Sequence, residues 1–73
     1  MSEPTCSIVV NGDPLEIAPG STVLGLLEAL DRDPRTVAIE LNGEVLPRRV
    51  FAEVELGAGD RIEVVRFVQG GAA

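Results

Sequence analysis

Residues 37–47, VAIELNGEVLP, decide how this chain folds. Apolar residues alternate with others over residues 37–41, which is the period of a strand with one buried face. The dipeptide Asn42-Gly43 follows, and this pair favours the two-residue turn of a β-hairpin. The apolar residues 45–46 then supply a short return strand. The stretch therefore predicts a β-hairpin with a stubby second strand.

A second hairpin of the same kind is predicted nearer the N-terminus. Cys6, Ile8 and Val10 fall on one face of an extended segment, and the turn pair Asn11-Gly12 follows them. Apolar residues alternate again over residues 15–17, so the chain returns as a strand. The alternation points Cys6 inward, as a small core residue.

Between the hairpins the apolar period changes to that of a helix. The apolar stripe, at positions i, i+3, i+4 and i+7, consists of Val23, Leu26, Leu27 and Leu30. Ser21 or Thr22 can cap this helix, and Asp33-Pro34 is expected to stop it. Gly25 lies inside the helix, either because another backbone passes close by or because the position tolerates it.

The C-terminal third is predicted to hold one more strand. Residues 48–56 have neither period and are expected to form an irregular, partly 3₁₀ segment anchored to the core. A glycine-rich turn at 57–60 precedes a β-prone run at 61–68. Residues 69–73, which include Gly70 and Gly71, carry no side chain able to anchor them.

The order β-β-α-β-β-β on so short a chain requires one helix to cover one face of a mixed sheet. We therefore predict an α+β fold of the ubiquitin-like, or β-grasp, kind, with four to five strands packed on one helix. Residues 1–68 are expected to form this domain, and residues 69–73 a flexible tail.

The amino-acid composition and net charge exclude some classes of binding partner. The chain has 73 residues, with 12 acidic and 6 basic side chains and a net charge of −6. Nucleic acid and anionic lipid surfaces repel such a chain, so we expect neither as a partner, whereas a cationic protein attracts it. The N-terminus lacks the pattern of a signal peptide, no run is long enough to span a membrane, and Cys6 is the single cysteine. A cytoplasmic location is the expectation.

No catalytic constellation is found. The sequence contains no His and no Lys, so the usual acid/base groups and any partner to activate Cys6 are missing. Close carboxylate pairs, at positions 31 and 33 and at positions 53 and 55, are expected to be solvated rather than to bind metal. The turn at 57–59 lacks the length and the lysine of a phosphate-binding loop. We predict that the chain is not an enzyme and holds no cofactor or metal.

The Gly70-Gly71 pair is the remaining unusual feature. Without side chains, such a tail can thread through a narrow channel into another protein's active site, where a glycine carboxylate is a chemical handle. The alternative is a frayed chain end without a role.

Five segments in this order and spacing resemble the ThiS family of sulfur carriers in thiamine biosynthesis. They are residues 9–12, 22–27, 37–48, 59–65 and 68–71. The resemblance implies that an E1-like (ThiF-like) enzyme uses ATP to adenylate the terminal glycine carboxylate. Sulfur from a cysteine desulfurase then makes a thiocarboxylate, from which a ThiG-like thiazole synthase takes the sulfur. Carried onto this chain, the reactive carbonyl carbon belongs to Gly71, and Gly70 precedes it.

One departure from the family pattern concerns the end of the chain. Ala72-Ala73 follow Gly71, so Gly71 is held in a peptide bond in the sequence as written. The hypothesis is that a peptidase removes these two residues before activation, as in some carriers of the wider family. The alternative is an appended pair that is not native.

The last strand also offers a docking patch for partners. Val65 and Phe67 fall on the face opposite Ile62 and Val64, although a bulge would instead turn Phe67 into the core. The partner-binding residues expected here are Val65, Phe67, Val68 and Gln69.

Other functions of the same fold stay open at this point. A carrier for another acceptor, in molybdopterin, cysteine or tRNA thiolation, has the same Gly-Gly ending. A ubiquitin-like interaction module or protein modifier is a different class, and the lack of Lys forbids only lysine-linked self-chains.

Overall fold

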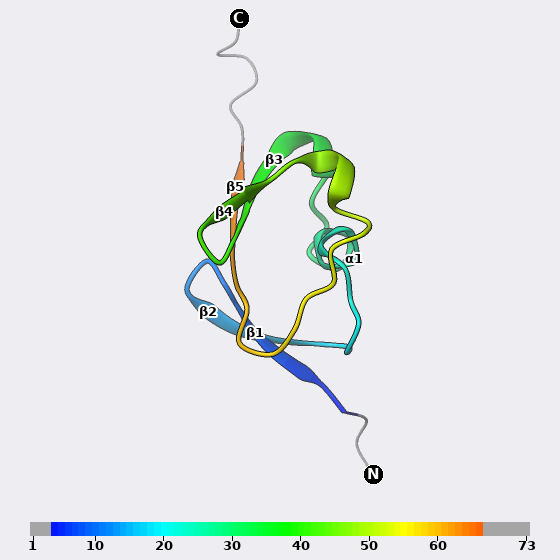
Figure 1. Ribbon diagram of the computed structural model, residues 1–73, viewed down its shortest axis with the longest axis vertical. Helices are drawn as coiled ribbons and strands as arrows, with labels where there is room; N and C mark the ends of the chain where they lie inside the picture. Colours follow the sequence, from blue (N-terminus) through cyan, green and yellow to red (C-terminus); the bar gives the residue numbers. More distant parts are fainter. Residues whose placement is uncertain (1–3, 67–73) are drawn as a thin grey trace, which may run out of the picture.

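The structure is a computed structural model that describes residues 4–66, and it places them in a five-stranded sheet with one α-helix against one face (Figure 1). The strands are β1 (Cys6–Val10), β2 (Asp13–Ile17), β3 (Val37–Leu41), β4 (Glu44–Leu46) and β5 (Arg61–Arg66). The helices are α1 (Val23–Ala29) and two 3₁₀ turns, η1 (Pro34–Thr36) and η2 (Arg48–Val50). The predicted α+β class is confirmed.

The sheet is mixed, with the strand order β2-β1-β5-β3-β4. β1 runs parallel to β5, and every other neighbouring pair is antiparallel. The last strand in the chain therefore lies at the centre of the sheet, between the two hairpins. This order could not be read from the sequence, because the pairing of β1 with β5 joins segments about fifty residues apart.

Both predicted hairpins form around their Asn-Gly pairs. Asn11 and Gly12 have φ angles of 50° and 87°, and Asn42 and Gly43 have 52° and 88°. A two-residue turn with both φ angles positive matches the right-handed twist of the strands that it joins. Asparagine and glycine tolerate this left-handed backbone better than other residues, so the turn chemistry fixes both hairpins.

The core lies between the helix and the sheet and is almost wholly aliphatic. Its buried members are Ile8, Val23, Leu26, Leu27, Val37, Ile39, Phe51, Leu56 and Ile62. Three of the four residues of the predicted helical stripe are among them, and the fourth, Leu30, packs half-buried at the margin. Cys6 is also half-buried and packs against this core.

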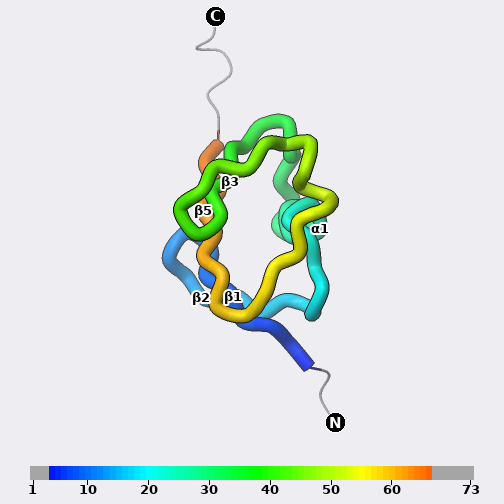
Figure 2. Tube along the Cα trace, viewed as in Figure 1, coloured from blue at the N-terminus to red at the C-terminus, as the bar shows by residue number. Residues whose placement is uncertain are grey.

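The first turn of α1 is capped by a segment distant in the sequence. The N–H of Val23 donates to the carbonyl of Val54 at 3.0 Å. The N–H of Leu24 donates to the carbonyl of Phe51 at 2.9 Å. The predicted cap Thr22 accepts the next free N–H through its hydroxyl oxygen. These bonds satisfy helix donors that would otherwise lack partners, and Figure 2 shows the yellow stretch of chain passing beside the helix.

The helix ends earlier than the proline suggests. The prediction that Asp33-Pro34 stops it is wrong, because α1 already ends at Ala29. Asp31 adopts a left-handed φ of 60°, and the N–H of Arg32 then bonds the Leu27 carbonyl at 2.8 Å. This is a Schellman ending, which usually places glycine at the left-handed position and so gave no sequence signal here.

Replacing Gly25 by alanine should stabilise the protein by about 0.5–1 kcal/mol, because glycine loses more conformational freedom than alanine in a helix. No other backbone passes close by, and a Cβ would meet the Thr22 hydroxyl oxygen at 3.4 Å, an ordinary contact. The midpoint of urea unfolding should rise. Gly43→Ala is the matched control and should lower the midpoint, because Gly43 has a φ of 88°. A fall with Gly25→Ala would contradict this account of the helix.

Candidate functional site

The carboxyl end of β5 is the candidate site, because the predicted reactive residues follow it in the sequence. β5 pairs with β3 over residues 62–66, from Leu41↔Ile62 to Val37↔Arg66. With β1 it shares only two register pairs, Val9↔Arg61 and Val10↔Ile62. The last four residues of β5 are thus in main-chain register with a neighbouring strand on one side only.

The Asn11 side chain extends the β1 side of this ladder. The N–H of Val64 donates to Asn11 Oδ1 at 2.7 Å, and Asn11 Nδ2 donates to the Val64 carbonyl at 3.3 Å. The main chain of the hairpin has already turned away at this point. One side-chain amide therefore replaces a peptide group of the missing strand, since it offers both a donor and an acceptor.

Asn42 plays the same part at the opposite end of β5. Its Oδ1 accepts the N–H of Arg61 at 2.9 Å, and its Nδ2 donates to Asp60 Oδ1 at 3.1 Å. The other oxygen of Asp60 accepts the N–H of Gly57 at 2.7 Å, which closes the turn before the strand. Both Asn-Gly pairs were recognised as turn signals alone. The signal for the second role is the choice of Asn over Asp in both turns, because only the amide has a donor.

The outer face of the sheet, away from α1, carries the predicted docking residue that the structure describes. Val65 is 55% exposed there, while Ile62 is buried and Val64 half-buried on the helix side. The predicted orientation of Val65 is therefore found, and its role in binding stays a prediction. Val45 on β4 is also exposed, at 70%. The other predicted site residues, Phe67, Val68, Gln69, Gly70 and Gly71, lie outside the described residues.

Two like charges face each other on the same surface. Glu40 of β3 lies directly opposite Glu63 of β5, and both are exposed. Like charges in directly opposed positions destabilise a sheet. Within residues 4–66 the one ion pair joins Arg35 to Asp33, so neither glutamate has a cationic partner there. The outer face is suited to a positively charged protein surface, and sequence reasoning missed this pair because it depends on the register.

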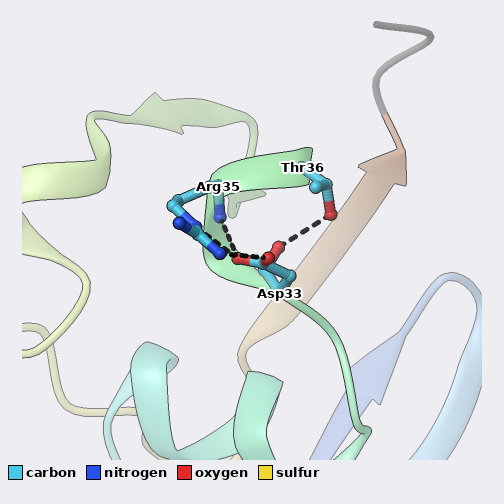
Figure 3. Close-up of polar contacts among 3 residues, drawn as sticks. All are labelled: Asp33, Arg35 and Thr36. Carbon is cyan, nitrogen blue, oxygen red and sulfur yellow. Dashed lines mark hydrogen bonds and ion pairs between the residues drawn. The ribbon is translucent and has the colours of Figure 1, made fainter.

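The loop that leads from α1 to β3 borders the end of β5. Arg35 donates to both carboxylate oxygens of Asp33, at 3.2 and 3.0 Å, and its main-chain N–H donates to Oδ1 at 2.9 Å (Figure 3). The Thr36 hydroxyl donates to the Asp33 carbonyl at 2.8 Å. These hydrogen bonds from Arg35 lower the pKa of Asp33 below its ordinary value. The carboxylate thus stays ionised and keeps η1 in place.

Neither a metal centre nor a membrane span is seen in the part of the chain that the structure describes. No three Cys, Asp or Glu side chains of residues 4–66 are grouped so as to hold a metal ion. The carboxylates at 31, 33, 53 and 55 are all exposed. The single α-helix in the described range has seven residues, too few to cross a membrane.

Comparison with known proteins gives the family. The model of the ThiS family matches residues 8–71, which is most of the chain. The chain belongs to the ThiS family. Its sheet and helix are those of the predicted β-grasp fold.

Two whole-length relatives agree with this assignment. The crystal structure of the thiamine biosynthesis protein ThiS from Geobacter metallireducens superposes with a TM-score of 0.77 at 37% identity, covering 85% of this chain and 94% of that one. The sulfur carrier protein ThiS of Escherichia coli is 33% identical over 64 residues, which are 88% of this chain and 97% of that protein.

A thiazole synthase of Paramagnetospirillum magneticum matches over a part of its length. It is 39% identical over 64 residues, which are 88% of this chain and 20% of that protein. The chain therefore spans about a fifth of the thiazole synthase.

Removing the Asn11 side-chain amide should weaken the attachment of β5 to the first hairpin. Asn11→Gly keeps the left-handed turn and deletes both hydrogen bonds to Val64, so we expect a loss of about 1–2 kcal/mol in the free energy of unfolding. The Val64 amide should also exchange its hydrogen faster. Urea unfolding and NMR hydrogen exchange measure the two effects. An unchanged Val64 exchange rate in Asn11→Gly would show that the side-chain bonds do not hold the strand.

Proposed function

We propose that this ThiS family protein carries sulfur as a thiocarboxylate on Gly71. The observation that supports this most is the family match, which extends to residue 71 and so includes the Gly70-Gly71 pair. The carrier named from Escherichia coli is similar over nearly its whole length. The proposed steps are activation by an E1-like adenylating enzyme, sulfur transfer from a cysteine desulfurase, and delivery to an acceptor.

This chain contributes one reacting group, the carboxylate of Gly71. A Gly71 carboxylate oxygen attacks the α-phosphorus of ATP bound by the adenylating enzyme, and pyrophosphate leaves. The outer sulfur of a persulfide on a partner protein then attacks the acyl carbon and displaces AMP, which gives an acyl disulfide. A thiol of a partner cleaves this disulfide, so that the thiocarboxylate leaves and a new disulfide forms on the partner. The chain supplies the carboxylate and a docking surface, and the partners supply the catalytic groups. ATP is bound by the activating partner in this proposal, and the carrier holds no cofactor.

Trimming of the chain end is part of the proposal. Ala72-Ala73 follow Gly71 in the sequence, so the Gly71 carbonyl is in a peptide bond until they are removed. A peptidase that cleaves after Gly71 would expose the carboxylate that adenylation requires. Once Ala72-Ala73 are removed, residues 69–71 are the part of the chain that would enter the active site of the adenylating enzyme.

Thiazole formation in thiamine biosynthesis is the proposed destination of the sulfur. A protein named thiazole synthase contains a stretch that is 39% identical to 88% of this chain. A carrier-like stretch within the same polypeptide as a thiazole synthase places donor and acceptor at high effective concentration. This supports a ThiG-like thiazole synthase as the enzyme that accepts sulfur from this chain.

The outer face of the sheet is the proposed docking surface for the adenylating enzyme. It combines the exposed apolar side chains Val45 and Val65 with the opposed glutamates Glu40 and Glu63. An apolar surface rimmed by arginine or lysine would complement it, since apolar contact supplies affinity and opposite charge speeds encounter.

ATP–pyrophosphate exchange with an E1-like enzyme from the same genome tests activation and trimming together. The chain ending at Gly71 should support exchange, and the 73-residue chain should not. A chain ending at Gly70 is the control for the position of the carboxylate. Equal exchange with the 73-residue chain would refute the trimming step. No exchange with either form would refute the carrier function.

Glu63→Gln should have opposite effects on the stability of the domain and on its association with the adenylating enzyme. The change removes one of two opposed charges, so the unfolding free energy should rise by about 0.2–1 kcal/mol. The same change should slow association with the adenylating enzyme and reduce its dependence on salt. Stopped-flow association at low and high ionic strength measures this, and Glu53→Gln is the control for a glutamate off the sheet. Identical association rates for both variants would argue against the outer face as the docking surface.

A further inference from the structure

Within residues 4–66, the edge of β5 that faces β1 has no main-chain partner at Arg66, the last residue of the strand. Alternate residues of a strand direct their main-chain groups to the same side. Ile62 and Val64 use this side: the Ile62 carbonyl accepts the N–H of Asn11, and Val64 bonds the Asn11 side chain. Arg66 directs its N–H and carbonyl the same way, and the described hydrogen bonds of residues 4–66 give them no partner there.

The pairing of β5 with β3 shows which way the main-chain groups of Arg66 point. Arg61 bonds Asn42 with its main-chain carbonyl and N–H, so Arg61, Glu63 and Val65 are the residues whose main chain faces β3. Arg66 lies opposite Val37 in a pair that exchanges no main-chain hydrogen bonds. Among the residues that the structure describes, none pairs with its N–H and carbonyl, which can therefore accept one more strand on the β1 side.

A recessed surface runs along this edge. A hollow of about 280 Å³ lies beside Val64, and its apolar lining includes Leu15 and Leu30. A second hollow, of about 390 Å³, is lined in part by Arg66. Arg32 lines both, so the two hollows are neighbours along β5. An extended peptide beside Arg66 would have an apolar pocket within reach of a nearby side chain.

We propose that this Arg66 edge is a strand-addition site for an extended segment of the E1-like adenylating enzyme. The main chain of the segment pairs with the Arg66 N–H and carbonyl, and an apolar side chain fills the hollow beside Leu15, Leu30 and Val64. An unpaired edge is a ready template for such pairing. The inference rests on the proposed function, because that function names the partner.

The position of the reactive residue supports this occupant. Gly71 follows Arg66 by five residues, so the two are at most about 17 Å apart even in a fully extended chain. An enzyme that encloses Gly71 therefore lies within reach of the Arg66 edge. A second copy of the chain is disfavoured, since each carries a net charge of −6 and two copies repel.

Hydrogen exchange in the complex tests the proposal directly. NMR exchange is measured on the 73-residue chain and on the chain ending at Gly71, each free and saturated with the adenylating enzyme without ATP. Exchange at the Arg66 amide should slow by about tenfold or more on binding, the effect of one hydrogen bond. Exchange at Val64, already bonded to Asn11, should change far less. Unchanged Arg66 exchange in a saturated complex overturns the inference and leaves the proposed function standing, whereas absence of binding by both forms overturns both.

A matched pair of substitutions in the chain ending at Gly71 separates the main chain from the side chain. Arg66→Pro removes the free N–H without removing a bond to β3, and Arg66→Ala removes only the side chain. In pyrophosphate exchange, Arg66→Pro should raise the KM for the carrier about tenfold above that of Arg66→Ala, with similar kcat. Equal KM values would overturn the proposal. Urea unfolding checks that both variants fold, and if the proline variant does not, the exchange result at Arg66 decides.

Discussion

The fold depends on the hydrogen bonds that join β5 to a hairpin on each of its two sides. The two hairpins do not pair with each other in the sheet, and β5 alone joins them. On the β1 side the main-chain register covers only two residue pairs, so the side chain of Asn11 carries the contact onward to Val64. Asn42 secures the other end at Arg61. The asparagine in the turn of each hairpin thus also forms hydrogen bonds with β5, the strand that precedes the Gly-Gly pair.

This arrangement combines a small packed core with a surface around β5 that is suited to binding partners. Among residues 4–66, nine buried apolar residues fill the space between α1 and the sheet. The free energy of unfolding of a domain this small is only on the order of a few kcal/mol. The outer face nevertheless opposes Glu40 to Glu63. Within residues 4–66 the main-chain groups of Arg66 also have no partner on the β1 side. Both features involve β5, the strand that leads to Gly71. Both features reduce the stability of the isolated domain, and a partner that covers this end of the molecule would offset that loss.

Local sequence patterns predicted most of the elements. Turn chemistry located both hairpins, helical spacing located the buried stripe of α1, and alternation placed Val65 opposite Ile62. These features depend on neighbours in the chain, and so the sequence contains them directly. The family resemblance, carried by five short segments, was confirmed by the family match over residues 8–71.

Features that depend on contacts between distant segments were not predictable in the same way. The carbonyls of Phe51 and Val54 cap α1, and no local pattern marks that bond. The helix ends through a left-handed Asp31 where the proline suggested a later stop. The opposed glutamates and the asparagine bonds to β5 exist only once the register is known. The roles of Gly70 and Gly71 stay predictions, since they lie outside the described residues.

An intact mass of the protein from its native host tests the central claim, that Gly71 is the sulfur-bearing end. The account predicts a mature chain that ends at Gly71, part of which carries one sulfur in place of one oxygen. Fragmentation should place that sulfur on the terminal residue. A chain that keeps Ala72-Ala73 and never gains sulfur, even in cells starved of thiamine, would contradict the account.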